Sequence, residues 1–302
     1  MKYLVIGGVA GGATAAARLR RMDENADIIL FERGKYVSYA NCGLPYYIGG
    51  VIAERDKLFV QTAEGFTARF NIDIRTEQEV TVIHPKEKNV EVKNLRTGQS
   101  YTESYDKLVL SPGAEPLRPG IEGIDSKKIF TLRNVPDTDT IKKYIDREHP
   151  RHAVVVGGGF IGLEMAENLH DQGLDIAVVE MANQVMAPLD YSMAAIVHQQ
   201  LIEKKVDLRL EDGVLRFEET DGGIIVHLKS GKQIPTDLVI LSIGVRPETK
   251  LAKEAGLAIG TLGGIAVNDY MQTSDPDIYA LGDAVAVSYT HLRAHETRSN
   301  LV

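Results

Sequence analysis

The chain of 302 residues has one cysteine, Cys42, and no apolar run that approaches the length of a membrane span, which is about 20 residues. A single cysteine allows no internal disulfide, which agrees with a reducing compartment or with a thiol kept for chemistry. The chain also has few basic residues for a nucleic-acid-binding protein, since its formal net charge is −8 and no basic stripe is evident. Neither nucleic acid nor a membrane is therefore expected as a partner.

The N-terminus superficially resembles a signal peptide, because Lys2 precedes apolar and small residues. The glycines that follow fit a phosphate-binding loop instead, and Arg18, Arg20 and Arg21 come directly after it. We therefore expect a cytoplasmic protein. With 44% hydrophobic residues, the chain can bury two cores, so at least two domains are expected.

The first 32 residues have the pattern of a nucleotide-binding βαβ unit. A short apolar run at residues 2–6 leads through a glycine-rich loop into a helix of small residues, and a second strand is predicted at 27–31. Glu32 follows Gly12 by twenty residues. Glycines let the backbone approach a pyrophosphate, and the carboxylate accepts hydrogen bonds from ribose hydroxyls. The loop departs from the usual motif at Val9, which replaces the middle glycine.

The same pattern is repeated in the second half of the chain. Residues 153–156 lead into a complete G-x-G-x-x-G motif at 157–162, and a strand at 176–179 ends in Glu180. Two such units imply two dinucleotides. A carboxylate at the ribose favours free 2′ and 3′ hydroxyls and repels a 2′-phosphate, and no arginine follows Glu180. We therefore predict a preference for NADH over NADPH of more than about tenfold in kcat/KM.

The fold class predicted from this repeat is α/β, with two Rossmann-like dinucleotide-binding domains, the second inserted in the first. Buried strands that end at glycine, at 108–113 and 238–244, are each followed within three residues by a proline and mark the crossovers between domains. We expect a discontinuous first domain at 1–115 plus 247–287, and a second domain at 116–246.

The returning segment at residues 273–284 carries a further signal. It reads as a strand that ends in Gly282 and Asp283 before a helix, an arrangement that can aim a carboxylate at the ribityl chain of a flavin. An ordinary helix-capping aspartate is the alternative interpretation.

The two glycine loops, the crossovers Ser-Pro-Gly at 111–113 and Ser-Ile-Gly at 242–244, and Tyr-Ala-Leu-Gly-Asp at 279–283 together resemble the pyridine nucleotide-disulfide oxidoreductase family. This resemblance implies FAD in the first loop and NAD(H) in the second, because Asp283 pairs with the N-terminal domain. The implied FAD-binding residues are Gly7, Gly8, Val9, Ala10, Gly11, Gly12, Glu32, Arg33, Gly113, Asp283 and Ala284, and the implied NAD-binding residues are Gly157, Gly159, Phe160, Ile161, Gly162, Glu180 and Gly244.

The paired Cys-x4-Cys of glutathione and lipoamide reductases is missing, and residues 38–45, with Cys42 alone, resemble instead the coenzyme A-disulfide reductases. Related enzymes are NADH oxidases, NADH peroxidases and NADH-dependent persulfide reductases. The implied path takes a hydride from NADH to flavin N5 and electrons through C4a to Cys42, which is held as a mixed disulfide with coenzyme A or as an oxidised sulfur. The alternative is that Cys42 is a small apolar residue of the core.

Further residues divide these subfamilies. Related peroxidases and water-forming oxidases often have a histidine where this chain has Ala10, so the oxidase and peroxidase alternatives are disfavoured. A third alternative is an electron-transfer flavoprotein of the ferredoxin-reductase type, whose partner is a redox protein and in which Cys42 is incidental. By resemblance to the disulfide reductases, the residues that would contact coenzyme A are Thr14, Arg18, Arg21, Ser38 and Asn41; the two arginines are three apart on one helix face, where a solvated surface is the alternative.

The C-terminus departs from the family, whose members continue into an interface domain that forms a homodimer. Residues 288–302 have little apolar periodicity and resemble a translated sequencing adaptor, so we expect a non-native tail there. His291 and His295 are four apart, as metal ligands on a helix can be, but no metal site is expected. The expected partner of the full-length protein is a small-molecule disulfide or persulfide.

Overall fold

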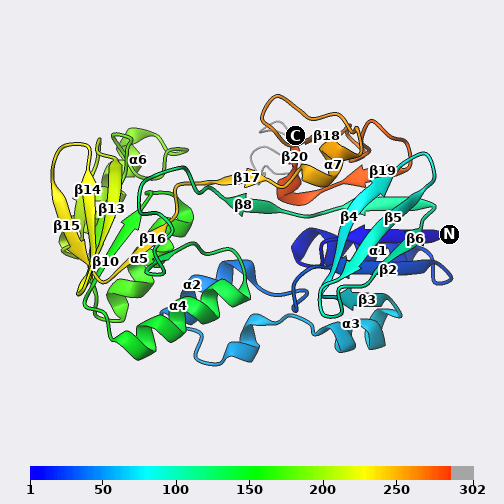
Figure 1. Ribbon diagram of the computed structural model, residues 1–302, viewed down its shortest axis with the longest axis horizontal. Helices are drawn as coiled ribbons and strands as arrows, with labels where there is room; N and C mark the ends of the chain where they lie inside the picture. The colour runs from blue at the N-terminus through cyan, green and yellow to red at the C-terminus, as the bar shows by residue number, and fades with distance from the viewer. Residues whose placement is uncertain (287–302) are drawn as a thin grey trace. The chain divides into compact units, whose positions relative to one another are not determined.

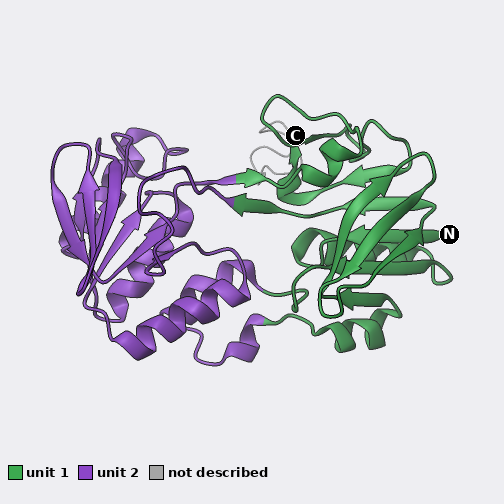
Figure 2. Cartoon of the chain, viewed as in Figure 1, with its two compact units in different colours: residues 1–39, 59–115, 246–302 green, residues 40–58, 116–245 purple. Residues whose placement is uncertain are grey.

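The computed structural model describes residues 1–286 and has two compact units (Figure 2). Of the described residues, unit 1 contains 1–39, 59–115 and 246–286, and unit 2 contains 40–58 and 116–245. The segment 40–58, which carries Cys42, therefore groups with unit 2, whereas the predicted boundaries assigned it to the first domain. The predicted tail at 288–302 lies outside the described residues.

Each unit is built on a five-stranded sheet in which all the strand pairs are parallel. The strand order β3-β2-β1-β7-β19 in unit 1 corresponds to β12-β11-β10-β16-β9 in unit 2. This repeated order confirms the predicted α/β class with two Rossmann-like units. The strands are β1 (Lys2–Ile6), β2 (Asp27–Glu32), β3 (Asp73–Thr76), β7 (Lys107–Leu110) and β19 (Ile278–Ala280), and β9 (Ile129–Phe130), β10 (His152–Val156), β11 (Asp175–Val179), β12 (Asp207–Arg209) and β16 (Leu238–Leu241).

A three-stranded antiparallel sheet accompanies each parallel sheet, and Figure 1 labels its strands together with the helices. The antiparallel strands are β4 (Gln78–His84), β5 (Asn89–Asn94) and β6 (Ser100–Ser104), and β13 (Val214–Thr220), β14 (Gly223–Leu228) and β15 (Gln233–Thr236). The helices are α1 (Ala10–Met22), α2 (Leu44–Ile48), α3 (Ala63–Phe70), α4 (Val135–Glu148), α5 (Phe160–Asp171), α6 (Tyr191–Glu203) and α7 (Lys250–Glu254). Two short pairs complete the fold: β8 (Ala114–Pro116) with β17 (Val245–Pro247), and β18 (Ile265–Ala266) with β20 (Val285–Ala286).

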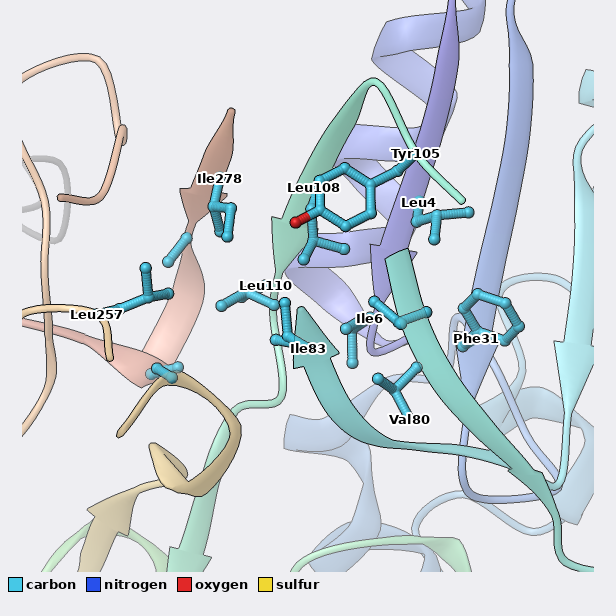
Figure 3. Close-up of a cluster of buried hydrophobic side chains, with 14 of the residues drawn as sticks. Leu4, Ile6, Phe31, Val80, Ile83, Tyr105, Leu108, Leu110, Leu257 and Ile278 are labelled. Atoms are coloured by element: carbon cyan, nitrogen blue, oxygen red, sulfur yellow. The ribbon is translucent and has the colours of Figure 1, made fainter. Parts of the chain in front are cut away.

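The core of unit 1 follows from the alternation of side chains along a strand. Leu4 and Ile6 of β1 are buried in one cluster with Val80 and Ile83 of β4, as Figure 3 shows. Val5 belongs instead to the cluster on the other face, with the buried alanines of α1. Both faces of the sheet are thus covered, which explains the continuous apolar runs of its strands.

The core of unit 2 repeats this arrangement. Val154 and Val156 of β10 are buried with Phe217 and Val226 of the antiparallel strands β13 and β14. No helix in the described part of the chain is both long and apolar enough to cross a membrane.

Candidate dinucleotide and thiol sites

The first glycine loop turns tightly between β1 and α1. Gly7 has a φ of +98°, and a Cβ at this position would lie 2.1 Å from the carbonyl oxygen of Ser111. A Cβ on Gly12 would lie 1.8 Å from the carbonyl oxygen of Gly7. Neither approach leaves room for a side chain, so both glycines are required by the backbone. The loop leaves the N–H groups of the first turn of α1 without partners inside the helix, as an anion site requires.

The side chain of Glu32, at the end of β2, is held by two backbone N–H groups, one of which belongs to this loop. One carboxylate oxygen, Oε2, accepts the N–H of Gly8 at 2.8 Å, and the other, Oε1, accepts the N–H of Gly34 at 2.7 Å. The side chain is only partly buried. A fixed, accessible carboxylate beside a phosphate loop fits the adenosine ribose of a dinucleotide.

The second glycine loop has the same geometry. Gly157 has a φ of +107°, and a Cβ there would lie 2.4 Å from the carbonyl oxygen of Ser242. A Cβ on Gly162 would lie 2.0 Å from the carbonyl oxygen of Gly157. Oε2 of Glu180 accepts the N–H of Gly158 at 2.7 Å, and its Oε1 accepts the N–H of Ala182 at 2.8 Å. These residues fit a second dinucleotide.

The residues at the middle of the second loop and at the start of α5 are exposed. A Cβ on Gly159 would meet no atom within 4 Å, and the next residue, Phe160, is 63% exposed. Ile161 is exposed as well. Gly244 has a φ of +117°, and its carbonyl oxygen accepts the N–H of Leu117 at 3.0 Å.

The returning segment of the chain meets the first loop within unit 1. The N–H of Leu281 donates to the carbonyl oxygen of Leu110 at 2.9 Å, and a Cβ on Gly11 would lie 2.5 Å from Cδ1 of Leu281. Asp283 is exposed in the short 3-10 helix η3 (Gly282–Ala284), and Ala284 is buried beneath it. This position of Asp283 fits a second contact to the dinucleotide of the first loop.

Two more of the predicted FAD residues, Arg33 and Gly113, lie in unit 1. Arg33 donates to Oε1 of Glu115 at 2.6 Å. Burial opposes the charge of the guanidinium, but the hydrogen bond and charge of Glu115 outweigh that effect and raise the pKa of Arg33. Gly113 has a φ of +77°, and its carbonyl oxygen accepts the N–H of Glu248 at 2.9 Å.

One residue that supports the second loop was missed from the sequence. His198 is buried on α6, and its Nε2 accepts the N–H of Val185 at 3.1 Å. Cγ1 of Val185 is 2.7 Å from the place of a Cβ on Gly158, and the N–H of Met186 donates to the carbonyl oxygen of Gly158 at 2.8 Å. Because Nε2 must be unprotonated to accept, the neutral imidazole holds this loop in place. A histidine among apolar residues of a helix is the only sequence signal, and by itself it indicates no partner.

The predicted substrate residues are distributed over both units. Thr14, Arg18 and Arg21 are all exposed on α1, and their spacing puts them on one face. The guanidinium carbon of Arg21 is 5.7 Å from the ring centroid of Phe70, so this arginine also packs against an aromatic ring. Ser38 lies in unit 1, where its N–H donates to the carbonyl oxygen of Gly8 at 2.8 Å.

Cys42 lies in unit 2, in the 3-10 helix η1 (Asn41–Gly43). Its side chain is an exposed free thiol, so it is not a buried residue of the core. Asn41 beside it is exposed as well. The short helix α2 follows directly, with Leu44 and Pro45 buried at its start. An exposed thiol held on a short turn is accessible to a small substrate.

Two acidic side chains of α5 act electrostatically on Tyr46, four residues after Cys42. The charge of Glu164 is the main cause that raises the pKa of Tyr46, with smaller effects of burial and of the charges of Glu167 and Cys42. Burial, and then the charge of Glu167, also raise the pKa of Glu164. The residues of α5 are thus close enough to the Cys42 segment to influence its electrostatics.

Comparison with known proteins gives this arrangement a context. The family model described as pyridine nucleotide-disulphide oxidoreductase matches residues 1–298. A coenzyme A disulfide reductase of Staphylococcus haemolyticus is 38% identical over 291 residues, which are 96% of this chain and 64% of that protein.

Two solved structures are similar over nearly the whole chain. The crystal structure of reduced Bacillus anthracis CoADR-RHD is 59% identical with a TM-score of 0.92, and the match covers 94% of this chain and 51% of that one. A NAD-dependent persulfide reductase from A. fulgidus is 40% identical with a TM-score of 0.91, and the match covers 94% of this chain and 53% of that one. The chain therefore spans between about half and two thirds of the length of these relatives.

Proposed function

Because the chain belongs to the pyridine nucleotide-disulphide oxidoreductase family, we propose that it is the dinucleotide-binding part of an NADH-dependent flavoprotein. Its proposed substrate is a low-molecular-weight disulfide or persulfide such as coenzyme A disulfide. The observation that carries this proposal is the combination of two glycine loops, each with a fixed carboxylate, and one exposed thiol at Cys42. Two similar proteins, a coenzyme A disulfide reductase and a NAD-dependent persulfide reductase, support it.

The first loop would hold FAD, which when bound supplies a centre that takes an electron pair from a nicotinamide and passes it on. Gly7 and Gly12 allow the tight turn that would bring the loop backbone to the diphosphate, because a Cβ at either position would clash with a backbone carbonyl oxygen. Glu32 would accept hydrogen bonds from the adenosine ribose, and Asp283 would do so from the ribityl chain. The N-terminus of α1 would stabilise the phosphate charge.

The second loop would hold NADH by the same means. Glu180 would accept from the 2′ and 3′ hydroxyls, while its negative charge would repel the 2′-phosphate of NADPH. Gly159 leaves the backbone open to the pyrophosphate, since a Cβ there would meet no atom within 4 Å. Phe160 and Ile161, exposed at the start of α5, would cover the dinucleotide.

Cys42 would carry out the thiol chemistry. Its thiolate attacks one sulfur of the substrate disulfide, so that a mixed disulfide with Cys42 forms and the first thiol leaves. The electron pair that one NADH would supply would then reduce the mixed disulfide, which would release the second thiol and restore the Cys42 thiolate. In sum, one disulfide, one NADH and one proton give two thiols and NAD⁺. For coenzyme A, the guanidiniums of Arg18 and Arg21 would pair with phosphates, and Thr14, Ser38 and Asn41 would donate further hydrogen bonds.

Replacement of the sulfur tests this function directly. Cys42→Ser should abolish reduction of coenzyme A disulfide but leave FAD bound and reducible by NADH, because neither glycine loop changes. Arg147→Ala, which removes an exposed side chain of unit 2, serves as the control variant. Disulfide reduction retained by Cys42→Ser would remove Cys42 from the mechanism. Release of coenzyme A from purified protein on treatment with a thiol reductant would identify the bound thiol, and its absence would favour a persulfide.

The full-length protein is proposed to be a cytoplasmic homodimer. The single cysteine agrees with a reducing compartment, and the expectation of a dimer comes from the resemblance to longer relatives. Light scattering of the full-length protein tests the dimer, and a monomeric mass would contradict it.

A further inference from the structure

The segment that carries Cys42 is fixed to unit 2 by a bidentate ion pair. Nε and Nη2 of Arg55 donate to the two different carboxylate oxygens of Asp139 on α4, each at 2.8 Å. The two side chains are 30% and 22% exposed, so water screens them only in part. A parallel pair of charge-assisted hydrogen bonds fixes orientation as well as distance. This pair therefore anchors the end of the segment 40–58 that lies farther along the chain from Cys42.

A second anchor holds the C-terminal end of α2. The carbonyl oxygen of Gly49 accepts a short hydrogen bond from Nε2 of Gln172, at the C-cap of α5. Asn168 is 2% exposed, and its Oδ1 is 2.1 Å from the place of a Cβ on Gly49. Its Nδ2 donates to the carbonyl oxygen of Glu164 at 2.8 Å, which fixes the amide. Only glycine fits at position 49, so α2 is seated directly on α5.

The helix that provides this second anchor, α5, also begins within the second glycine loop. α5 has 12 residues, which correspond to a length of about 18 Å. Its first turn contains Gly162, packed against the carbonyl oxygen of Gly157. Its last turn and C-cap contain Asn168 and Gln172. One rigid helix thus bears the second dinucleotide loop at its N-terminus and the Cys42 segment at its C-terminus.

We propose that four residues position Cys42: Arg55, Asp139, Asn168 and Gln172. They fix the orientation of its thiol relative to unit 2 and to the second glycine loop. The proposal rests on the proposed function, because it takes Cys42 as the reacting thiol. A disulfide must approach the sulfur along the S–S axis, so the thiol needs a fixed orientation and not only exposure. A displacement of about 1 Å in such a step costs up to about a hundredfold in rate.

The test is a single-turnover reaction of the reduced chain with coenzyme A disulfide, with release of coenzyme A as the readout. Arg55→Ala and Gln172→Ala should each lower this rate by about tenfold. The rate of alkylation of Cys42 by iodoacetamide, which needs an exposed thiol but no fixed orientation, should stay within about twofold. The affinity for NAD⁺ should also be unchanged, because neither side chain belongs to the glycine loop.

Three further variants make the result specific. Arg55→Lys keeps the charge but not the planar fork, so it should restore only part of the rate. Arg55→Ala combined with Asp139→Ala should be no slower than either alone, because both remove the same contact. Arg147→Ala on the same helix α4, whose pair with Glu148 is exposed, should react like the parent chain.

Two results would overturn the inference. In the first, Arg55→Ala and Gln172→Ala exchange with coenzyme A disulfide at the parent rate. In the second, exchange, alkylation and NAD⁺ affinity all fall together, which indicates loss of structure in unit 2. Failure of the proposed function is a separate outcome, because it appears as disulfide exchange that persists in Cys42→Ser.

Discussion

The two glycine loops have the same backbone geometry and differ in the side chains that surround it. In each, a glycine with positive φ begins the turn, and the last glycine packs against the carbonyl oxygen of the first. Glu32 and Glu180 each accept one N–H from the loop and one from the residue two positions farther along the chain. In the proposed function, the backbone would set what both loops bind, a dinucleotide diphosphate with its ribose, and the surrounding side chains would set which dinucleotide.

Two differences separate the loops. Val9 has a Cβ where Gly159 has none, so only the second loop is fully open at its middle position. The second difference lies in the segment that hydrogen-bonds to each loop, which contains Ser38 in unit 1 and Met186 in unit 2. Different contacts hold these two segments in place. In unit 2 the segment is held by His198 through Val185, whereas in unit 1 the carbonyl oxygen of Ser38 accepts the N–H groups of Val60 and Gln61 at 2.8 and 3.2 Å. Substitutions at corresponding positions of the two loops can therefore affect the binding of one dinucleotide without affecting the other.

The largest effect is expected when the closing glycine of one loop is replaced. Gly12→Ala and Gly162→Ala place a Cβ 1.8 and 2.0 Å from a backbone oxygen, and such overpacking costs about 1–3 kcal/mol, or about five- to 150-fold in affinity if the loop must distort to bind. Gly12→Ala should lose FAD and keep NAD⁺ binding, and Gly162→Ala should do the reverse. Flavin absorbance measures the FAD content, and calorimetric titration measures the affinity for NAD⁺. The control is Gly120→Ala, whose Cβ would meet no atom within 4 Å; loss of FAD from Gly162→Ala would contradict the assignment.

A second effect concerns the choice between NADH and NADPH. The parent protein should prefer NADH by more than about tenfold in kcat/KM, and Glu180→Gln should reduce that preference by removing the charge that repels a 2′-phosphate. The matched variant Glu32→Gln changes the corresponding carboxylate of the first loop and should leave the preference unchanged. Steady-state rates with both nucleotides measure it. Equal use of NADH and NADPH by the parent protein would show that Glu180 does not discriminate.

A smaller effect is expected from the support of the second loop. His198→Ala removes the acceptor of the Val185 N–H, a hydrogen bond worth about 1 kcal/mol, which is about fivefold in affinity. The KM for NADH should rise by that factor with kcat unchanged, and FAD content should stay the same. His198→Gln, which retains an acceptor, should recover part of the affinity. A fall in kcat without a change in KM would indicate a role other than support of the loop.

The smallest expected effect concerns the response of unit 1 to acid. Burial raises the pKa of Glu103 in unit 1, but hydrogen bonds from Lys2 and Arg75 outweigh burial and lower it below the ordinary value of 4.5. The folded state therefore binds the proton less tightly than the unfolded state, so the stabilisation is present above pH 4.5 and is lost as the pH falls through the lowered value. Glu103→Gln should make the free energy of unfolding, measured with denaturant, less dependent on pH as the pH falls below 4.5. An unchanged acid dependence would contradict this.

The sequence was informative wherever function depends on residues close together in the chain. Both βαβ units, their glycines and the positions of Glu32 and Glu180 could be predicted, because strand periodicity and loop glycines are local signals. The segment around Cys42 was different. Its connection to unit 2 depends on Arg55 and Asp139, which are 84 residues apart. No local pattern links an arginine to one particular aspartate at such a separation. The bond between His198 and Val185 spans only 13 residues, but a histidine among apolar residues of a helix does not indicate its partner.

The measurement that tests the account most directly is an anaerobic titration of the FAD-loaded chain with NADH, followed by addition of coenzyme A disulfide. If Cys42 is a second redox centre beside the flavin, the oxidised protein takes up about two electron pairs, and coenzyme A disulfide reoxidises it. The Cys42→Ser variant then takes up one pair. Uptake of one pair by the parent chain, with no reoxidation by the disulfide, would contradict the role of Cys42 on which the proposed function depends.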